Sequence, residues 1–213
     1  MEESIRKRRL LILHTFLCTA EPVSSSVVAH LLSSPNSNGP SIGTVDIVLR
    51  RLHAVLYTEH ERVLFYHKSF SNFLFDRERS GEFWCDQTTQ HWLLTESCFR
   101  VMEAELRFNI ANIPSSFILD RDNDRLAVEV GQNISTVLAY SCRSWSHHMC
   151  FGDLVTPNPP CERLSEFLHL RALFWMEVMN LLGLRGRCHA MLRKVSSWVK
   201  KVSTVPTHQL LRY

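Results

Sequence analysis

Glycine and proline are scarce in this sequence, at seven and eight of 213 residues. That scarcity excludes collagen-like chains and chains disordered by Gly/Pro-rich composition. No glycine is followed by lysine, so the Gly-Lys-Ser/Thr turn of a phosphate-binding loop is absent, as are the G-x-G-x-x-G fingerprint and the G-x-S-x-G nucleophile motif. We therefore expect no nucleotide hydrolysis and no other enzymatic activity from this chain alone.

Metal-binding motifs are also missing. The seven cysteines are scattered, and no two form a C-x-x-C pair. Cys142, His147, His148 and Cys150 come closest to a zinc-like group, but adjacent histidines point to different sides of a helix, and no second close pair accompanies them. The sequence thus predicts no metal site. Free, buried thiols in a reducing compartment are the simplest interpretation, which predicts a cytoplasmic protein.

Long apolar runs are lacking as well. The most apolar stretch, residues 167–182, contains Arg171 and Glu177 and is too short to span a bilayer. The start of the chain, IRKRRLLILHTFLCTA, resembles a signal peptide, but its apolar run is short, contains His14 and fits one face of a helix. We therefore expect a first helix there, and no transmembrane segment.

The first 86 residues show short helical and strand-like patterns. The expected helices cover residues 4–18, 24–32, 44–57 and 69–76, and the expected strands cover 62–67 and 83–85. Ser24 or Ser25 is expected to cap the second helix. Three helices followed by a strand, a crossing element and a strand make the winged-helix pattern. We predict a winged-helix domain over residues 1–86, with three helices and a small β-hairpin.

From residue 87 onward the pattern is purely helical. Helical runs are expected over residues 88–110, 123–150, 160–184 and 186–204, with a proline-rich loop at 155–161. We predict an all-helical domain over residues 87–213, and a mostly α fold class for the chain. The last run is a basic amphipathic helix, which we expect to pack on the preceding helix or on a following segment of a longer chain. Its apolar stripe consists of Cys188, Met191, Leu192, Val195, Trp198, Val199 and Val202. Binding to a membrane or to an acidic partner is the alternative.

Residues 52–83 carry the most distinctive motif. Their core, Phe65-x-His67-x-Ser69-Phe70-x-x-Phe73, resembles the F-x-H-x-S-F-x-x-F element of winged-helix domains in NACHT-type signal-transducing (STAND) NTPases, the group of the NOD-like receptors. Further blocks are similar to members of this group from mushroom-forming fungi, many of which carry WD repeats. These blocks are EPVSSSVVAHLL at 21–32, YSCRSWSHH at 140–148 and FLHLRALFWMEV at 167–178.

The resemblance implies a role for His67. In that family the winged-helix histidine contacts the β-phosphate of bound ADP and helps to hold the closed state, and by motif this role falls on His67. An imidazole N–H is a directional hydrogen-bond donor to an anion. ADP or ATP would be a ligand only in the presence of a NACHT domain, so the chain alone has no cofactor. Ser69 is expected to cap the helix that follows.

The function that the resemblance implies is that of a non-catalytic regulatory or interaction module in innate-immunity-like, nonself-recognition signalling. Its expected partners are proteins, such as a NACHT domain or a WD-repeat domain. No NACHT core precedes residue 1 and no WD repeats follow residue 213, so we expect a gene fragment or a truncated paralogue. A degenerate fragment without a selected function is a further alternative.

A winged-helix DNA-binding regulator is the main alternative, because many winged helices bind DNA through their third helix. That helix would present Arg50 and Arg51, and the adjacent strand would present Arg62. However, Asp46 in the helix's first turn would repel phosphate groups. With a formal net charge of only +3, a strongly basic face is missing, and we expect no nucleic-acid partner.

Overall fold

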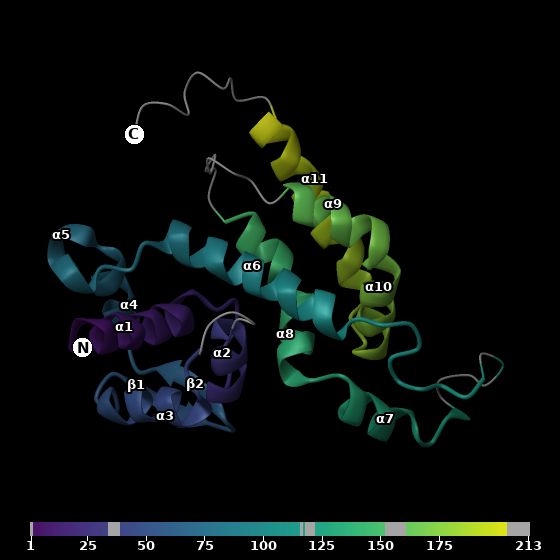
Figure 1. Cartoon of the computed structure of the whole chain (residues 1–213), viewed down its shortest axis with the longest axis horizontal. Helices are drawn as coiled ribbons and strands as arrows, with labels where there is room; N and C mark the ends of the chain where they lie inside the picture. The colour runs from purple at the N-terminus through teal and green to yellow at the C-terminus, as the bar shows by residue number, and fades with distance from the viewer. Residues whose placement is uncertain (1, 34–38, 116, 118–121, 152–160, 204–213) are drawn as a thin grey trace. The chain divides into compact units, whose positions relative to one another are not determined.

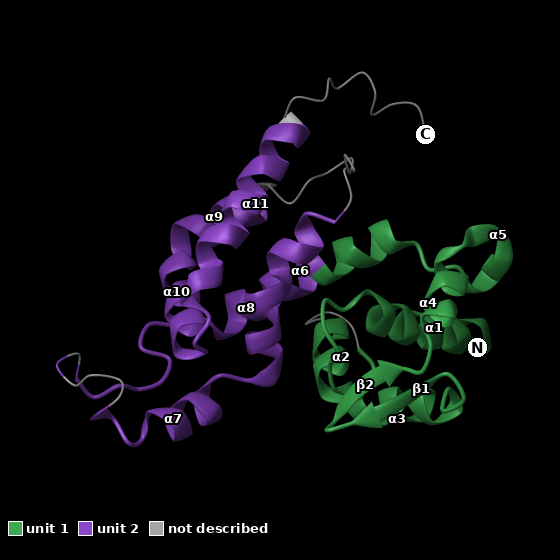
Figure 2. Ribbon diagram, turned by 180° about the vertical axis from the view of Figure 1, so that it is seen from behind, with its two compact units in different colours: residues 1–94 green, residues 95–213 purple. Residues whose placement is uncertain are grey.

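The computed structural model of the chain describes residues 2–33, 39–115, 117, 122–151 and 161–203 (Figure 1). The described residues are mostly helical and hold one two-stranded antiparallel sheet. The chain divides into two compact units, Met1–Leu94 and Thr95–Tyr213 (Figure 2). This division falls inside helix α6 (Gln87–Glu105) rather than just before it, where the pattern change in the sequence had suggested a boundary. Most of the predicted loop at 155–161 lies outside the described residues.

The first unit begins with three helices, α1 (Glu2–Cys18), α2 (Ser25–Leu32) and α3 (Ile42–Arg51). Ser24 caps α2, as one of the two predicted serines, because its Oγ accepts the Val27 N–H at 3.5 Å. Ser41 caps α3 in the same way through the Thr44 N–H. The three helices pack pairwise around one apolar core. Its most buried members are Ile12, Val28, Leu31 and Val45.

A β-hairpin follows α3 and consists of β1 (Leu56–Glu59) and β2 (Arg62–Phe65). Its register pairs Leu56 with Phe65 and Thr58 with Val63. Leu56 and Val63, on the same face, are buried. The Val63 N–H also donates to the carbonyl of Val23, between α1 and α2, at 2.9 Å. The hairpin is therefore joined both to the apolar core and to the backbone between the first two helices.

Three of the predicted element boundaries in this unit are wrong. The helix predicted over 44–57 ends at Arg51, and Tyr57 and Thr58, which favour extended structure, lie in β1. The strand predicted over 62–67 ends at Phe65. The strand predicted at 83–85 does not form, because Gly81–Phe83 is a 3-10 turn (η1) and the Cys85 N–H donates to the Leu74 carbonyl instead of to a strand.

Two short helices separate the hairpin from α6. These are α4 (Lys68–Phe75) and α5 (Arg77–Ser80). Asp76 caps α5 by accepting the N–H groups of Glu78 and Arg79, both at 3.1 Å. The second predicted strand is absent, and β2 pairs instead with β1, which precedes it in the chain. Helix α4 therefore follows the hairpin and does not connect its two strands.

The described residues of the second unit contain the end of α6 and five further helices. They are α7 (Leu126–Asn133), α8 (Thr136–Met149), α9 (Cys161–Leu170), α10 (Ala172–Leu181) and α11 (Arg185–Ser203). Two runs predicted as single helices are each divided. Ser135 separates α7 from α8 and caps α8 through the Leu138 N–H at 3.0 Å. Arg171 separates α9 from α10, and its guanidinium donates to the Leu106 carbonyl.

An aromatic cluster forms the core of the second unit. Trp145 of α8 lies 5.6 Å from Phe99, 5.1 Å from Phe167 and 5.8 Å from Trp175, measured between ring centroids. Trp145 and Trp175 have no exposed surface, and the Trp175 indole N–H donates to the Cys142 carbonyl at 2.9 Å. Tilted and edge-on contacts of this kind contribute beyond the buried area. Residues distant in sequence are thus joined in one core.

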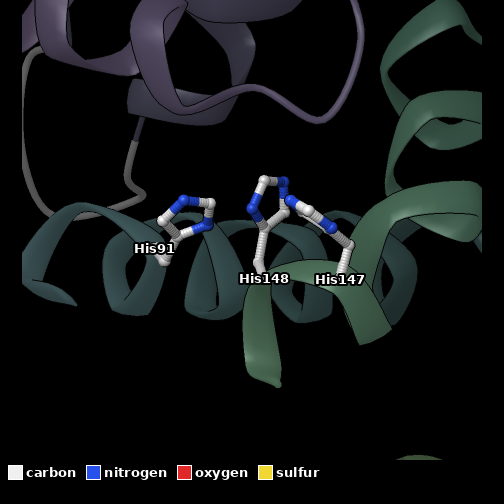
Figure 3. Close-up of side chains that lie close together, drawn as sticks. All are labelled: His91, His147 and His148. Carbon is white, nitrogen blue, oxygen red and sulfur yellow. The ribbon is translucent and has the colours of Figure 1, made fainter. Parts of the chain in front are cut away.

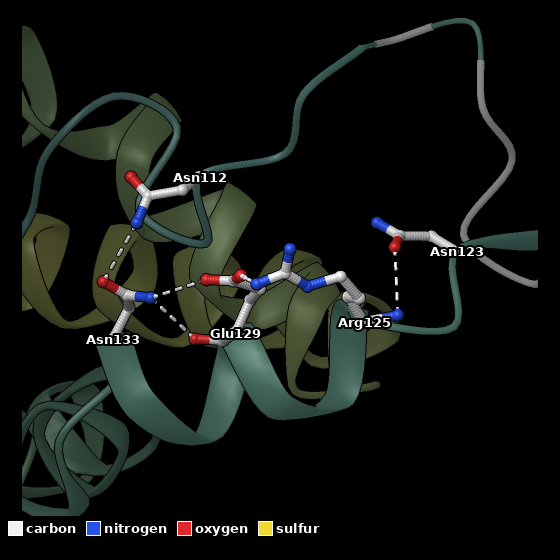
Figure 4. A network of polar contacts seen from close by, with 5 residues as sticks. All are labelled: Asn112, Asn123, Arg125, Glu129 and Asn133. Atoms are coloured by element: carbon white, nitrogen blue, oxygen red, sulfur yellow. Dashed lines mark hydrogen bonds and ion pairs between the residues drawn. The ribbon is translucent and has the colours of Figure 1, made fainter.

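Hydrogen bonds of the Asn133 side chain connect helix α7 to the loop that follows α6 (Figure 4). Its side-chain oxygen accepts from Asn112 at 3.3 Å and from Arg107 at 3.0 Å, and its amide nitrogen donates to the Glu129 carbonyl at 2.9 Å. Glu129 in turn pairs with Arg125. Asn133 belongs to an Asn-Ile-Ser sequon, but in this structure its amide is engaged in hydrogen bonds within the unit.

Helix α11 packs with the apolar stripe that the sequence predicted. Cys188, Met191, Val195 and Trp198 are buried, and α11 contacts both α8 and α10. Packing on the preceding helices is therefore confirmed. Among the helices of the described part of the chain, none combines the length and the apolar character needed to cross a membrane.

The hairpin turn offers a test of the fold. His60 and Glu61 form its two-residue loop and have φ values of 47° and 63°, although this conformation favours Asn-Gly. Glu61→Gly should therefore raise the free energy of unfolding by about 1 kcal/mol, since it removes side-chain crowding at a positive φ. Urea denaturation of the full chain measures this change. Thr58→Gly is the control within β1, and it should destabilise the chain by about 0.5–1 kcal/mol. Equal destabilisation by both variants would contradict the positive φ assigned to Glu61 in the hairpin turn.

Candidate functional site

His67 is the N-cap residue of α4. It has the extended backbone of a cap, with φ −146° and ψ 138°, and its Nδ1 accepts the Ser69 N–H at 3.0 Å. Ser69 was predicted to cap this helix, and that prediction is wrong, because α4 already begins at Lys68 and the imidazole takes the capping position. The side chain of His67 is exposed. One ring nitrogen is thus committed to the backbone, and the ring itself faces solvent.

This hydrogen bond sets the proton distribution on the imidazole. A nitrogen that accepts an N–H cannot carry a proton, so the neutral ring holds its proton on Nε2. Protonation of Nδ1 would break the cap. The result is a ring fixed through Nδ1 with an Nε2–H donor available to a ligand.

The surroundings of His67 suit an anion. Lys68, the first residue of α4, is exposed beside it. The N-terminal end of an α-helix carries a partial positive charge from its unpaired N–H groups, which favours negative ligands. A cationic side chain, a helix N-terminus and an Nε2–H donor therefore share one end of α4. Together they can hydrogen-bond a phosphate or carboxylate group.

The aromatic residues of the motif hold α4 against the hairpin. The rings of Phe65 in β2 and Phe70 in α4 lie 6.0 Å apart, and Leu74 of α4 is buried. On the other face of the hairpin, Tyr57 and Tyr66 have ring centroids 4.8 Å apart. Tyr66 immediately precedes His67, so the residues on both sides of the candidate site are fixed by aromatic contacts.

Cys142, His147, His148 and Cys150, the group closest to a zinc-like motif, lie in α8 and directly after it. His148 is buried, and its Nε2 lies 2.8 Å from the hydroxyl of the buried Tyr140. His147, its exposed neighbour, has a ring that is nearly perpendicular to that of His148, at 78° (Figure 3). His91, also drawn in Figure 3, belongs to α6 in the first unit. His148 thus has a structural partner in the core of its own unit.

Three thiols of the second unit, those of Cys98, Cys142 and Cys150, have raised pKa values. Burial raises the pKa of Cys98 to about 12 and that of Cys150 to about 11. Burial also raises the pKa of Cys142 well above its ordinary value. The thiolate is the form that binds metal ions and attacks electrophiles. At neutral pH these three side chains are therefore present mainly as thiols.

The residues weighed for nucleic-acid binding lie on the first unit's surface. Arg50 and Arg51 are exposed at the C-terminal end of α3, and Arg62 is exposed in the hairpin. Asp46 is half-buried in α3. The groove between α1 and α3, which Arg8 and Arg9 help to line, is not predicted by the sequence. The run IRKRR was its only sequence signal, because periodicity alone does not show which arginines share a face with exposed apolar side chains.

Comparisons with known proteins give no match: no family model matches the chain, and no curated protein or solved structure is similar to it at a significant level.

The capping bond of His67 can be tested in the isolated chain. His67→Leu removes the acceptor for the Ser69 N–H and should lower the free energy of unfolding by about 1 kcal/mol. Aspartate is among the best N-cap residues, so His67→Asp should retain most of that stability. Urea denaturation, with His53→Leu as an exposed control in the same unit, measures the three effects. If leucine and aspartate at position 67 gave the same stability, His67 would not cap α4.

Proposed function

We propose that this chain is a non-catalytic regulatory module of a NACHT-type signalling NTPase, with a winged-helix domain followed by a helical domain. In this proposal His67 contributes a hydrogen bond to the phosphate of a nucleotide that a NACHT domain holds. The observation that carries the proposal is the capping bond at Nδ1, which leaves the Nε2–H donor of an exposed imidazole facing outward.

The arrangement of the first unit supports the winged-helix part of the proposal. Three mutually packed helices precede an antiparallel hairpin. The Val63 N–H donates to the Val23 carbonyl, so one backbone hydrogen bond joins the segment between α1 and α2 to the edge of the hairpin. A short first strand occupies that position in many winged helices. The single hairpin, with β1 before β2, supplies the wing.

The position of His67 supports the regulatory part. The residue lies at the junction of the hairpin and α4, beside exposed Lys68. A phosphate bound there would meet a neutral N–H donor, an ammonium group and a helix N-terminus. In this proposal these groups bind the phosphate and take no part in bond breaking. The site is therefore suited to sensing whether a phosphate is present, and the chemistry of hydrolysis belongs to the partner domain.

The effect of such a contact on the balance between closed and open states follows from thermodynamic linkage. A ligand stabilises the closed state only through its higher affinity for that state. A hydrogen bond to a charged group contributes about 1.5–3 kcal/mol, which corresponds to roughly a ten- to hundredfold change in an equilibrium. A change of this size is enough to move a switch whose two states are nearly balanced.

The proposal extends to partners and location. The expected partners are proteins: a NACHT domain that presents the nucleotide, and a WD-repeat domain in signalling related to innate immunity. We place the chain in the cytoplasm. Support comes from the free thiols of Cys18, Cys85, Cys98, Cys142 and Cys188, all buried, which suit a reducing compartment.

The regulatory role predicts an effect on nucleotide retention. When the chain is joined to the NACHT core of a similar fungal protein, His67→Leu and His67→Asp should both accelerate ADP release by about ten- to hundredfold. The aspartate variant is decisive, because it keeps the α4 cap while its carboxylate repels phosphate. Stopped-flow release of a fluorescent ADP analogue measures the rate.

His53→Leu serves as the control for an exposed histidine of the same unit that lies outside the site, and it should leave the release rate unchanged. Release from the aspartate variant at the wild-type rate would limit His67 to its capping role and would sink the proposed phosphate contact.

DNA binding is the second candidate, and one observation favours it: Arg50, Arg51 and His53 are exposed together at the end of α3 and in the turn after it. The half-buried Asp46 in the same helix opposes phosphate contact. Non-specific attraction to the sugar-phosphate backbone is the most that this small group of charges supports.

We expect weak binding to duplex DNA that is indifferent to sequence and decreases steeply as salt increases. Electrophoretic mobility shifts over a salt series, with the wild type and Arg50→Ala, test this expectation. A sequence-specific complex that persists at physiological salt and disappears in Arg50→Ala would favour a DNA-binding regulator instead.

A further inference from the structure

A groove of about 390 Å³ lies between α1 and α3 in the first unit. Ile5, Arg8 and Arg9 line it from α1, and Ile47 and Val48 line it from α3. The two helices pack directly against each other, so their own contact sets the spacing of the groove walls. None of these residues belongs to the site at His67, so the groove is a separate surface feature of the first unit.

The groove exposes an unusual amount of apolar side chain. Ile5 is 45% exposed and Ile47 is 46% exposed, and one stands on each helix. Val48, beneath them, is buried. Single exposed apolar residues are ordinary on protein surfaces, but two that line the same concavity offer a place where a partner's apolar side chain loses contact with water.

The charges beside these isoleucines are all positive. Arg8 and Arg9 are exposed, and neither takes part in a salt bridge with another residue that the structure describes. On the other side of α1 the basic residues are paired: Lys7 with Glu3 at 2.8 Å, and Arg6 with Glu82. No carboxylate lines the groove. Two unpaired guanidinium groups therefore stand at an apolar concavity and attract negative charge.

We propose that the groove between α1 and α3 binds an acidic amphipathic helix of a partner protein. Apolar side chains on one face of that helix enter between Ile5 and Ile47, and carboxylates beside them pair with Arg8 and Arg9. A nucleic acid has no aliphatic face to cover the isoleucines. A membrane surface is flat, and it would not reach the concave wall that Val48 forms.

The test uses fluorescein-labelled helical peptides of about 15 residues, a length that supports helix formation. The probe has leucines at i, i+3 and i+4 spacing and glutamates on its flanks. Two comparison peptides carry lysine in place of glutamate or serine in place of leucine. We expect fluorescence anisotropy to show binding of the leucine–glutamate peptide to the full chain, with binding at least about tenfold weaker for either comparison peptide.

Matched variants locate the binding. Arg8→Glu and Ile47→Ser should each weaken binding about tenfold or more. Lys7→Glu makes the same kind of charge reversal on the other side of α1, and Ile42→Ser removes an isoleucine of similar exposure, 43%, that does not line the groove. Both controls should leave the affinity within about twofold of the wild type. Circular dichroism confirms that each variant is folded.

Several results would overturn the proposal. These are no binding of the leucine–glutamate peptide, equal binding of the lysine peptide, or equal losses in the groove variants and their controls. Vesicles containing phosphatidylserine, or a short DNA duplex, that bound through Arg8 and Ile47 more tightly than the peptide would assign the groove to a lipid or nucleic-acid surface. The proposal and the role of His67 are independent, because the peptide assay involves no nucleotide and no residue of α4.

Discussion

The register of the β1–β2 hairpin determines where the first unit can present a ligand contact. The two-residue turn at His60 and Glu61 fixes that register, and it places Leu56 and Val63 together on the buried face. A slip of one residue would turn these side chains to solvent, so burial and turn geometry reinforce each other. The Tyr66 N–H extends the ladder to the Val55 carbonyl at 3.1 Å. His67 therefore leaves the hairpin from a fixed position, and α4 begins at once.

Two kinds of polar contact in this chain have different consequences. In the second unit, hydrogen bonds such as Trp175 to the Cys142 carbonyl and Tyr140 to His148 are buried and stabilise the core. At His67 and in the groove between α1 and α3, the polar groups are exposed and carry unused donors or positive charge. The second unit is a packed helical body, whereas both surfaces that we propose to contact a ligand belong to the first unit.

The sequence predicted the helices well where their apolar periodicity matched their burial. The stripe of α11 and the serine cap of α2 are examples. It failed at β1, because Val55 and Leu56 continue the helical spacing of α3 although Val55 lies in a turn and the buried Leu56 begins a strand. In addition, His60-Glu61 lacks the Asn-Gly signal of a tight turn. The capping role of His67 was also missed, since histidine is not among the preferred cap residues. The α1–α3 groove depends on the tertiary packing of two helices, which no local pattern encodes.

The central claim is that the capping bond fixes the His67 tautomer and leaves Nε2–H facing outward. Long-range proton–nitrogen NMR correlations of the histidine ring in the full chain measure this directly, because protonated and unprotonated ring nitrogens have distinct chemical shifts. The account predicts that, at a pH where the ring is neutral, Nε2 carries the proton and Nδ1 does not. A neutral His67 with its proton on Nδ1 would contradict it, since that ring could neither cap α4 nor donate from Nε2.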